Sequence, residues 1–509
     1  MAASPLSARP ASERPNGPPA WLFLFLLAVT AARLLAAAVI PLTEDEAYYR
    51  LWAQAPQLGY YDHPPMIAWW IGVGVGLMGD DPLGARLVPS LACGLSGLLI
   101  FDLARRLGAD RATAARASVW YNATLLVGMG GALATPDAAT TPFWVLTLWC
   151  LARTKEPKGE AWWLAAGAAG GLACLSKYSS LFIAPGVILW LAISPPGLAS
   201  LRRPWPWAAA IIAGALFGLN LAWNADHHWV TLHKQFGRLA PHGLKPQYLA
   251  ELLIGQFVLV NPLIAVFAIQ GLRGPWRAGP EPGRLDTRLL LATGLPFVAY
   301  LTLHSLHDRV QAHWPAPVYP SLAIIASAAA ARAPAGGWLE GLRRAAAPFG
   351  LGLSALAMAH LALPVTDIRG LNDPSGALRG WPAFARAVEQ LRQARGAAWI
   401  GTLSYGAAAQ LDAAGPKAPV VEIAERDRYL AGDASWRADL GRPGLLVDLK
   451  RRVNPETLRG CFALVEPVGE LVRHQGASRL DRYAVFLVAR PRRDVLAKGC
   501  FETTANAGL

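Results

Sequence analysis

Charged side chains are scarce in this sequence. Of its 509 residues only 16% are Asp, Glu, Lys or Arg, whereas 54% are hydrophobic and the mean hydropathy is +0.30. Ordinary soluble proteins carry roughly 25% charged residues, and a soluble enzyme with so few could not cover its surface. The same composition, with 20 Trp, excludes a collagen, a coiled coil, a disulfide-knotted secreted domain and a disordered chain. The sequence therefore predicts a polytopic α-helical membrane protein.

Cysteines at metal-ligand or redox spacing are also missing. The chain has five cysteines, none in a C-x-x-C pair or a Cys/His cluster, which argues against a zinc site or a redox motif. Cys93, Cys150 and Cys174 lie in apolar runs and are interpreted as small buried hydrophobic residues. Cys461 and Cys500 lie in the polar C-terminal part, where they can form a disulfide if that part is outside the cytoplasm.

Apolar runs of spanning length are abundant. After the Pro- and Ala-rich residues 1–20, the run 21–40 is long enough to cross a bilayer, and we interpret it as a span rather than a signal peptide. Ten further spans are predicted near 83–104, 117–134, 138–152, 161–175, 179–193, 206–223, 251–271, 289–303, 317–331 and 345–363. Residues 66–78 are apolar too, but their length is more typical of an interfacial or re-entrant helix. We expect about 11 to 13 spans.

The positive charges show how these spans are oriented. The net charge is +13, and Arg and Lys clusters at 105–116, 153–158, 202–203, 273–288 and 332–344 all fall on the side of the N-terminus. The positive-inside rule makes that side cytoplasmic, so the excess charge indicates no nucleic acid partner. The prediction is a cytoplasmic tail 1–20, a transmembrane domain 21–364 with a first outer loop 41–82, and an outer domain 365–509.

Residues 365–509 change character and predict a small α/β domain. Strand-like runs at 420–423, 445–449, 462–465 and 483–488 alternate with helix-like stretches at 381–393 and 406–413. The chain has no internal repeat and no Walker, Rossmann or kinase motif. The G-x-G-x-G at 72–76 is embedded in apolar sequence and is interpreted as a packing feature.

The first outer loop carries the most unusual polar sequence. It opens with Thr43, three consecutive carboxylates at Glu44, Asp45 and Glu46, and then Ala-Tyr-Tyr, and acids at a membrane interface are costly without a partner. The loop continues as Gly-Tyr-Tyr-Asp-His-Pro-Pro over 59–65, where the two prolines fix the backbone. Solvated acids and an Asp62 helix cap are the plain alternatives.

Asp45 and Glu46 beside this Asp-His-Pro-Pro turn resemble the GT-C class of integral-membrane glycosyltransferases that use polyprenyl-phosphate sugars. The similarity is to bacterial relatives of the protein O-mannosyltransferases, including the aminoarabinose and galacturonic acid transferases of lipid A. It continues in four further motifs, at 135–138, 175–179, 223–230 and 313–317. The aminoarabinose transferases usually have Lys before the two prolines, whereas His63 stands here, which argues against that particular sugar.

The resemblance implies roles for single residues. Sugar transfer needs a carboxylate to take the acceptor proton and cationic or donor groups to hold the departing phosphate. Asp45 matches the family's first-loop Asp and is the candidate base, with Glu46 positioning it or the acceptor; an acceptor that is already an ionised phosphate would need no base. The candidate substrate-binding residues lie in the motifs and outer loops: Tyr48, Tyr61, Asp62, His63, Asp137, Lys177, Tyr178, Arg238 and His313.

Plain alternatives exist for several of these residues. Lys177 is alternatively a snorkelling lysine that ends a helix, Asp137 a turn residue, and Arg238, Lys245 and Arg309 solvated loop charges. Four histidines between 227 and 242 suggest loop packing rather than a metal site, because their spacing is irregular. No resident metal is therefore predicted, although a divalent cation could assist the phosphate.

Asp-x-Asp, the carboxylate pair typical of metal-dependent nucleotide-sugar transferases, does not occur in the chain. This absence favours a lipid-linked donor. We therefore expect a hexosyl- or pentosyltransferase of the bacterial inner membrane, with its site and its C-terminal domain on the periplasmic side. Its partners would be a polyprenyl-phosphate sugar donor, lipid A or another envelope glycan as acceptor, and membrane lipids. Transfer to Ser or Thr of exported proteins, a lipid-linked sugar flippase, and a structural or sensor role are the alternatives.

Overall fold

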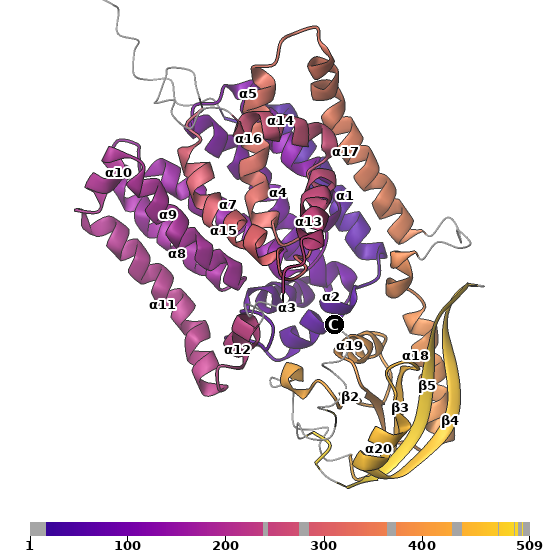
Figure 1. Ribbon diagram of the computed structural model, residues 1–509. Coiled ribbons are helices and arrows are strands. Elements are labelled where there is room, and N and C mark those ends of the chain that lie inside the picture. The colour runs from indigo at the N-terminus through magenta and orange to yellow at the C-terminus, as the bar shows by residue number, and fades with distance from the viewer. Residues whose placement is uncertain are drawn as a thin grey trace, which may run out of the picture.

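The computed structural model describes residues 17–237, 243–273, 285–363, 373–429, 440–476, 478–492, 494–496 and 501. Its helices over residues 20–362 form one body, and the C-terminal sheet lies below that body with α2 and α19 at the junction (Figure 1). The chain is mostly helical, as its composition predicts.

Within the described residues, four helices are long and apolar enough to cross a membrane. They are α1 (Ala20–Val39), α4 (Pro82–Arg106), α11 (Pro204–Asp226) and α17 (Trp338–Ala362). Four shorter apolar stretches cover Met66–Met78, Tyr178–Ala192, Arg288–His304 and Ala316–Ala331. The total number of spans stays a prediction.

The remaining helices of this body are shorter. They are α2 (Glu44–Gln54), α3 (Met66–Met78), α5 (Arg111–Asn122), α6 (Leu125–Gly130), α7 (Pro136–Arg153), α8 (Trp162–Cys174), α9 (Ile183–Ala192), α10 (Pro195–Ser200), α12 (Val230–Gly237), α13 (Gln247–Leu259), α14 (Pro262–Leu272), α15 (Arg288–His304) and α16 (Tyr319–Ala331). Short 3-10 turns are η1 (Gly159–Ala161), η2 (Tyr178–Phe182) and η3 (Ala316–Val318).

Two of the predicted spans are not continuous helices. The predicted helix 117–134 breaks between α5 and α6, where the Thr124 hydroxyl caps α6 by accepting from the Val127 amide. The predicted helix 251–271 breaks between α13 and α14, which meet at 110°. Asn261 lies at that break with φ 77°, and its side-chain amide donates to the carbonyls of Ala123 and Ala346. Pro262 follows Asn261, and a residue before proline avoids helical geometry.

The C-terminal part contains a five-stranded sheet of order β2-β1-β3-β5-β4. Its strands are β1 (Trp399–Thr402), β2 (Val420–Glu422), β3 (Gly444–Leu449), β4 (Phe462–Gln475) and β5 (Ser478–Pro491), and its helices are α18 (Trp381–Ala394), α19 (Tyr405–Ala413) and α20 (Pro455–Cys461), with turns η4 (Pro374–Leu378) and η5 (Arg426–Tyr429). β1 pairs in parallel with β2 and β3, whereas β5 pairs antiparallel with β3 and β4. The four predicted strands are confirmed, and β1 is an addition.

Side chains of alternating residues bury the two faces of this sheet. Leu445 and Val447 pack with α18 and α19, whereas Leu446 packs with α20 on the opposite face, as the two-residue period of a strand requires. Cys461, at the end of α20, is disulfide-bonded, and Cys93, Cys150 and Cys174 are free. The predicted partner, Cys500, lies outside the described residues.

The sheet domain is held against the helical body through α19 and α2. Ala409 of α19 is buried in one apolar cluster with Ala47 and Trp52 of α2. The Gln410 side chain donates to the Leu42 carbonyl at 2.8 Å, and Arg50 of α2 contacts Asp412 at 2.8 Å. Residues that are hundreds of positions apart in sequence therefore meet at α2 and the residues just before it.

Candidate active site

The first turn of α2 presents Asp45 to a cavity. Thr43 caps this helix by accepting from the Glu46 amide, and the Glu46 carboxylate accepts from the Thr43 amide at 3.0 Å. Such a capping box satisfies the free amides of a helix start and fixes where the helix begins. The orientation of Asp45 is therefore set by the residues on either side of it.

Glu46 itself is fully buried and does not line the cavity. Its carboxylate receives Arg86 Nε at 2.7 Å, Arg86 Nη2 at 2.6 Å and the Ala134 amide at 2.8 Å. Burial raises the pKa of Glu46, but Arg86 together with the amides of Thr43 and Ala134 outweighs burial, and the net pKa is below the ordinary glutamate value. Glu46 anchors α2 to α4 and to the loop before α7, so the prediction that it positions Asp45 fits this geometry, whereas a contact with the acceptor does not.

The Asp45 carboxylate faces the cavity from α2. Its Oδ1 accepts a hydrogen bond from the Tyr405 hydroxyl of α19 at 3.0 Å. Asp45 is accessible from the cavity, but protein atoms surround its carboxylate on the other sides. This partial burial raises the pKa of Asp45, and the effect is larger than the lowering effect of the Tyr405 hydrogen bond. A carboxylate of raised pKa is suited to accept a proton near neutral pH.

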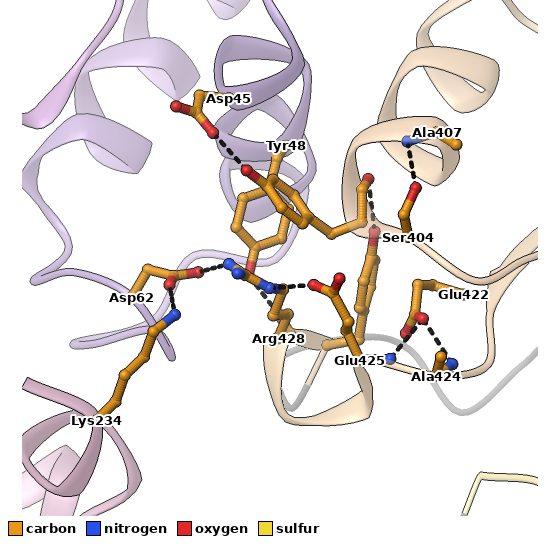
Figure 2. Close-up of polar contacts among 12 residues, drawn as sticks. Asp45, Tyr48, Asp62, Lys234, Ser404, Ala407, Glu422, Ala424, Glu425 and Arg428 are labelled. Carbon is orange, nitrogen blue, oxygen red and sulfur yellow. Dashed lines mark hydrogen bonds and ion pairs between the residues drawn. The ribbon is translucent and has the colours of Figure 1, made fainter. Parts of the chain in front are cut away.

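Asp62 of the Pro-Pro turn forms a buried ion cluster. It contacts Lys234 of α12, and its Oδ2 lies 2.6 Å from Arg428 Nη1 of η5 (Figure 2). Burial raises the pKa of Asp62, but the two cations together hold it below the ordinary aspartate value. Asp62 does not cap α3, because that helix begins after Pro65; its carboxylate instead ties the turn to α12 and to the C-terminal domain.

A second polar cluster lies at the Asp137 and Lys177 motifs. Lys177 Nζ contacts both oxygens of Asp137, at 2.8 and 2.7 Å, and His313 Nε2 lies 3.5 Å from Asp137 Oδ2. The Lys177 ammonium also lies 5.8 Å from the ring centroid of Trp314. Asp137 therefore holds the Lys177 ammonium in place. A snorkelling lysine needs no such partner, so this contact favours the substrate-binding interpretation over the snorkelling one. Burial lowers the pKa of His313.

These groups line one cavity of about 740 Å³. Asp45, Asp62, Asp137, Lys177 and His313 supply its polar wall. Apolar side chains cover the rest, among them Leu126, Val127, Met129, Leu181, Phe182, Phe297 and Tyr300. A cavity that combines charged groups of both signs with a largely apolar lining suits an amphiphile with a phosphate head and a hydrocarbon chain.

The other predicted residues fall in different places. Tyr48, His63 and Tyr178 line the cavity; the Tyr48 hydroxyl donates to the Arg428 carbonyl at 2.9 Å and that of Tyr178 to Asn220 at 2.8 Å. Tyr61 is not among the residues that line the cavity, and Lys234 Nζ lies 4.2 Å from its ring centroid. Arg238 lies outside the described residues.

Two loop cations that the sequence offered for phosphate lie elsewhere. Arg309 pairs with Glu251 at 2.8 Å on the exposed surface, and Lys245 is exposed beside Tyr248. The His227 ring stacks on Trp223 with centroids 4.0 Å apart. Among the described residues, no group of three or more His, Cys, Asp or Glu could hold a metal ion.

Sequence reasoning missed Tyr405, Arg428 and Lys234. Tyr405 and Arg428 come from the C-terminal domain, for which no motif was recognised, yet both line the cavity. The dense charge run Glu-Arg-Asp-Arg at 425–428 was the available signal, because such a run is unusual beside a buried strand. Lys234 lies four residues after the recognised motif at 223–230, so its position next to that motif was the available signal.

Comparison with known proteins gives relatives in sequence and in fold. Residues 62–223, which include Asp62, Asp137 and Lys177, match the family described as dolichyl-phosphate-mannose-protein mannosyltransferase. The lipid A galacturonosyltransferase RgtD of Rhizobium johnstonii is 28% identical over 292 residues, which are 55% of this chain and 59% of that protein. An undecaprenyl phosphate-alpha-4-amino-4-deoxy-L-arabinose arabinosyl transferase of Pseudomonas fluorescens is 30% identical over 28% of this chain and 25% of its own length.

The fold is similar along nearly the whole chain to a solved structure, ArnT from Cupriavidus metallidurans bound to undecaprenyl phosphate. The TM-score is 0.62 at 15% identity, and the match covers 94% of this chain and 99% of ArnT. The apo state of the same protein gives a TM-score of 0.60. By sequence over residues 62–223 and by fold along its length, the chain therefore resembles the bacterial GT-C membrane glycosyltransferases related to the protein O-mannosyltransferases.

Proposed function

We propose that this protein is a glycosyltransferase that moves a sugar from a polyprenyl-phosphate donor to lipid A or a related envelope glycan. The observation that carries the proposal is that the Asp45 carboxylate, the Lys177–Asp137 pair and many apolar side chains line the same cavity. Two sequence relatives support this choice of donor and acceptor. One is named as a lipid A galacturonosyltransferase and the other as a transferase for an undecaprenyl phosphate-linked sugar.

The proposed reaction divides between the two polar clusters. Lys177 and His313 hold the donor phosphate. The Lys177 ammonium has three N–H donors, and because two are directed at Asp137, the third is left for the phosphate. The acceptor hydroxyl oxygen attacks the anomeric carbon as the bond from that carbon to the phosphate oxygen breaks. The hydroxyl proton passes to Asp45, and the phosphate leaves with the bonding electrons. Direct displacement of this kind inverts the anomeric carbon.

The membrane arrangement belongs to the same proposal. We assign 11 to 13 spans to residues 21–364 and place the first outer loop and residues 365–509 on the periplasmic side of the bacterial inner membrane. The Arg and Lys clusters between the spans support this orientation through the positive-inside rule. Asp45 and Asp137 then lie at the outer interface, where a lipid-linked sugar is accessible.

Mass spectrometry of lipid A and core oligosaccharide tests the transfer itself. Cells that lack the protein are compared with cells that carry the wild-type chain, and we expect a glycosyl-sized mass only with the wild type. The mass identifies the class of sugar. Glycosylated exported proteins with unchanged lipid A would instead indicate transfer to Ser or Thr, and a change in lipid-linked sugar distribution with no transfer would indicate a flippase.

Lys177→Met is expected to weaken the binding of undecaprenyl phosphate by roughly 10- to 100-fold, the size of a lost charge-assisted hydrogen bond. Binding of that lipid to purified full-length protein, followed by intrinsic tryptophan fluorescence, provides the measurement. Lys245→Met is the matched control, because Lys245 is an exposed lysine outside the cavity wall.

The charge-balanced double variant Asp137→Asn/Lys177→Met separates two explanations of such a loss. If the weak binding of Lys177→Met comes only from the uncompensated Asp137 carboxylate, the double variant regains wild-type affinity. If Lys177 holds the phosphate, the double variant stays weak. Equal losses in Lys177→Met and Lys245→Met would refute the assignment of Lys177.

A further inference from the structure

We propose that Tyr405 of the C-terminal domain is a positioning residue for Asp45, and that Arg428 fixes Tyr405 in place. This inference rests on the proposed function, in which Asp45 accepts the acceptor proton. It gives the C-terminal domain a role in the reaction that neither the first-loop motifs nor the named relatives assign to it.

The Tyr405 hydroxyl is the side-chain donor that the structure places on Asp45. It lies 3.0 Å from Oδ1, which leaves Oδ2 of the same carboxylate without a hydrogen bond to Tyr405. A hydrogen bond to one oxygen fixes the rotation of a carboxylate and favours its charged form. Tyr405 therefore fixes the orientation of the Asp45 carboxylate and, in the proposed reaction, leaves its other oxygen for the acceptor proton.

Tyr405 is itself rigidly held. It is the first residue of α19, directly after Ser404, whose side chain caps the helix by accepting from the Ala407 amide. Gly406 follows, and a Cβ there would lie 2.7 Å from the Glu44 carboxylate, so α19 approaches the start of α2 closely. The Tyr405 ring also packs on Tyr48 of α2, with centroids 5.0 Å apart.

Arg428 covers the Tyr405 ring and connects it to Asp62. The guanidinium carbon of Arg428 lies 4.0 Å from the ring centroid of Tyr405, and its Nη1 contacts Asp62 at 2.6 Å. Glu425 contacts Arg428 Nε at 2.5 Å from the other side (Figure 2). A guanidinium is planar and stacks on aromatic faces while its N–H groups bind carboxylates. Arg428 thus uses both properties at once.

The loop before Arg428 is shaped by a buried carboxylate. Glu422, at the end of β2, accepts from the amides of Ala424 and Glu425 at 2.6 and 2.5 Å. The Tyr429 hydroxyl donates to the Tyr405 carbonyl at 3.3 Å. The sheet of the C-terminal domain therefore sets the position of the Arg428 side chain, and through it the positions of Tyr405 and Asp45.

The first test is the pH dependence of transfer by the full-length protein with Tyr405→Phe, a change that keeps the ring. The lost hydrogen bond favoured ionised Asp45, so its removal raises the pKa of Asp45 and moves the acid limb of the kcat profile to higher pH. We also expect kcat on the alkaline plateau to fall about tenfold, the equivalent of one weak charge-assisted hydrogen bond. Tyr248→Phe is the matched control, because Tyr248 lies beside Lys245 outside the cavity wall, and its acid limb is expected at the wild-type position.

A second measurement needs no substrate. Infrared titration of the carboxyl band, assigned to Asp45 by its loss in Asp45→Asn, follows protonation directly in the intact protein. Tyr405→Phe is expected to shift this titration to higher pH, and Arg428→Gln to shift it in the same direction, because a positive charge near Asp45 is removed. An unchanged titration in both variants overturns the inference. If the wild type transfers no sugar, the proposed function fails, and the infrared titration still decides whether Tyr405 controls Asp45.

Discussion

Asp45→Asn is expected to lower sugar transfer by about 10²- to 10⁴-fold, the usual contribution of a positioned general base. The asparagine keeps the size of the side chain and its position in α2, but it cannot take the proton of the acceptor hydroxyl. Undecaprenyl phosphate binding should be unchanged, because the phosphate contacts are assigned to Lys177 and His313. The measurement is single-turnover transfer to lipid A by purified full-length protein, alongside binding of the lipid phosphate.

Glu44→Gln is the matched control for this experiment. Glu44 is the adjacent carboxylate in the same helical turn, but it is exposed and is not part of the cavity wall. Its variant should transfer at the wild-type rate. Full transfer by Asp45→Asn would mean that the acceptor arrives as an ionised phosphate or that another group takes the proton, and either result removes the role assigned to Asp45.

Arg86→Leu is expected to destabilise the folded protein by about 3–5 kcal/mol, the cost of leaving one member of a buried ion pair alone. Arg86 and Glu46 are both fully buried, and Arg86 also donates to the carbonyls of Ile40 and Pro41 at 2.6 and 2.9 Å. Denaturant unfolding in mixed micelles, followed by tryptophan fluorescence, gives the free energy of unfolding.

Arg50, whose partners are exposed, offers the comparison for Arg86. The Arg50 side chain is 12% exposed, but its partners Asp80 and Asp412 are 44% and 37% exposed, so Arg50→Leu leaves no fully buried charge unpaired and should cost only about 1 kcal/mol. The depressed pKa of Glu46 adds a pH dependence: its contribution to stability is present above the ordinary glutamate pKa and is lost as the pH falls toward the folded value. A cost for Arg86→Leu as small as that for Arg50→Leu would show that Glu46 is held by its backbone contacts alone.

Local sequence signals were sufficient for much of the site. The carboxylates after the first apolar run, the Pro-Pro turn and the motifs at Asp137, Lys177 and His313 are each determined by a few neighbouring residues, and the structure brings Asp45, Asp62, Asp137, Lys177 and His313 to one cavity. Strands β2 to β5 were visible for the same reason, because short apolar runs bounded by turns need no distant partner to be recognised.

Long-range contacts were beyond the sequence. The role of Glu46 depends on Arg86, forty residues away in α4, and hydropathy alone does not connect them. The break at Asn261 is stabilised by carbonyls of Ala123 and Ala346, from two other parts of the chain. Tyr405 and Arg428 likewise contact Asp45 and Asp62 only because α19 packs on α2, and their own sequence does not show this packing. Periodicity reports which residues are buried, but it does not report what they are buried against.

The joining of Asp45 to Tyr405 across 360 residues has a consequence for biosynthesis. Chains are made from the N-terminus at about 5–20 residues per second, so the helical body is complete well before the ribosome reaches Tyr405 and Arg428. During that interval the nascent chain lacks both Tyr405 and Arg428, which line the cavity. Under the proposed function, a product truncated after α17 would therefore lack the residues that position Asp45 and would transfer no sugar efficiently.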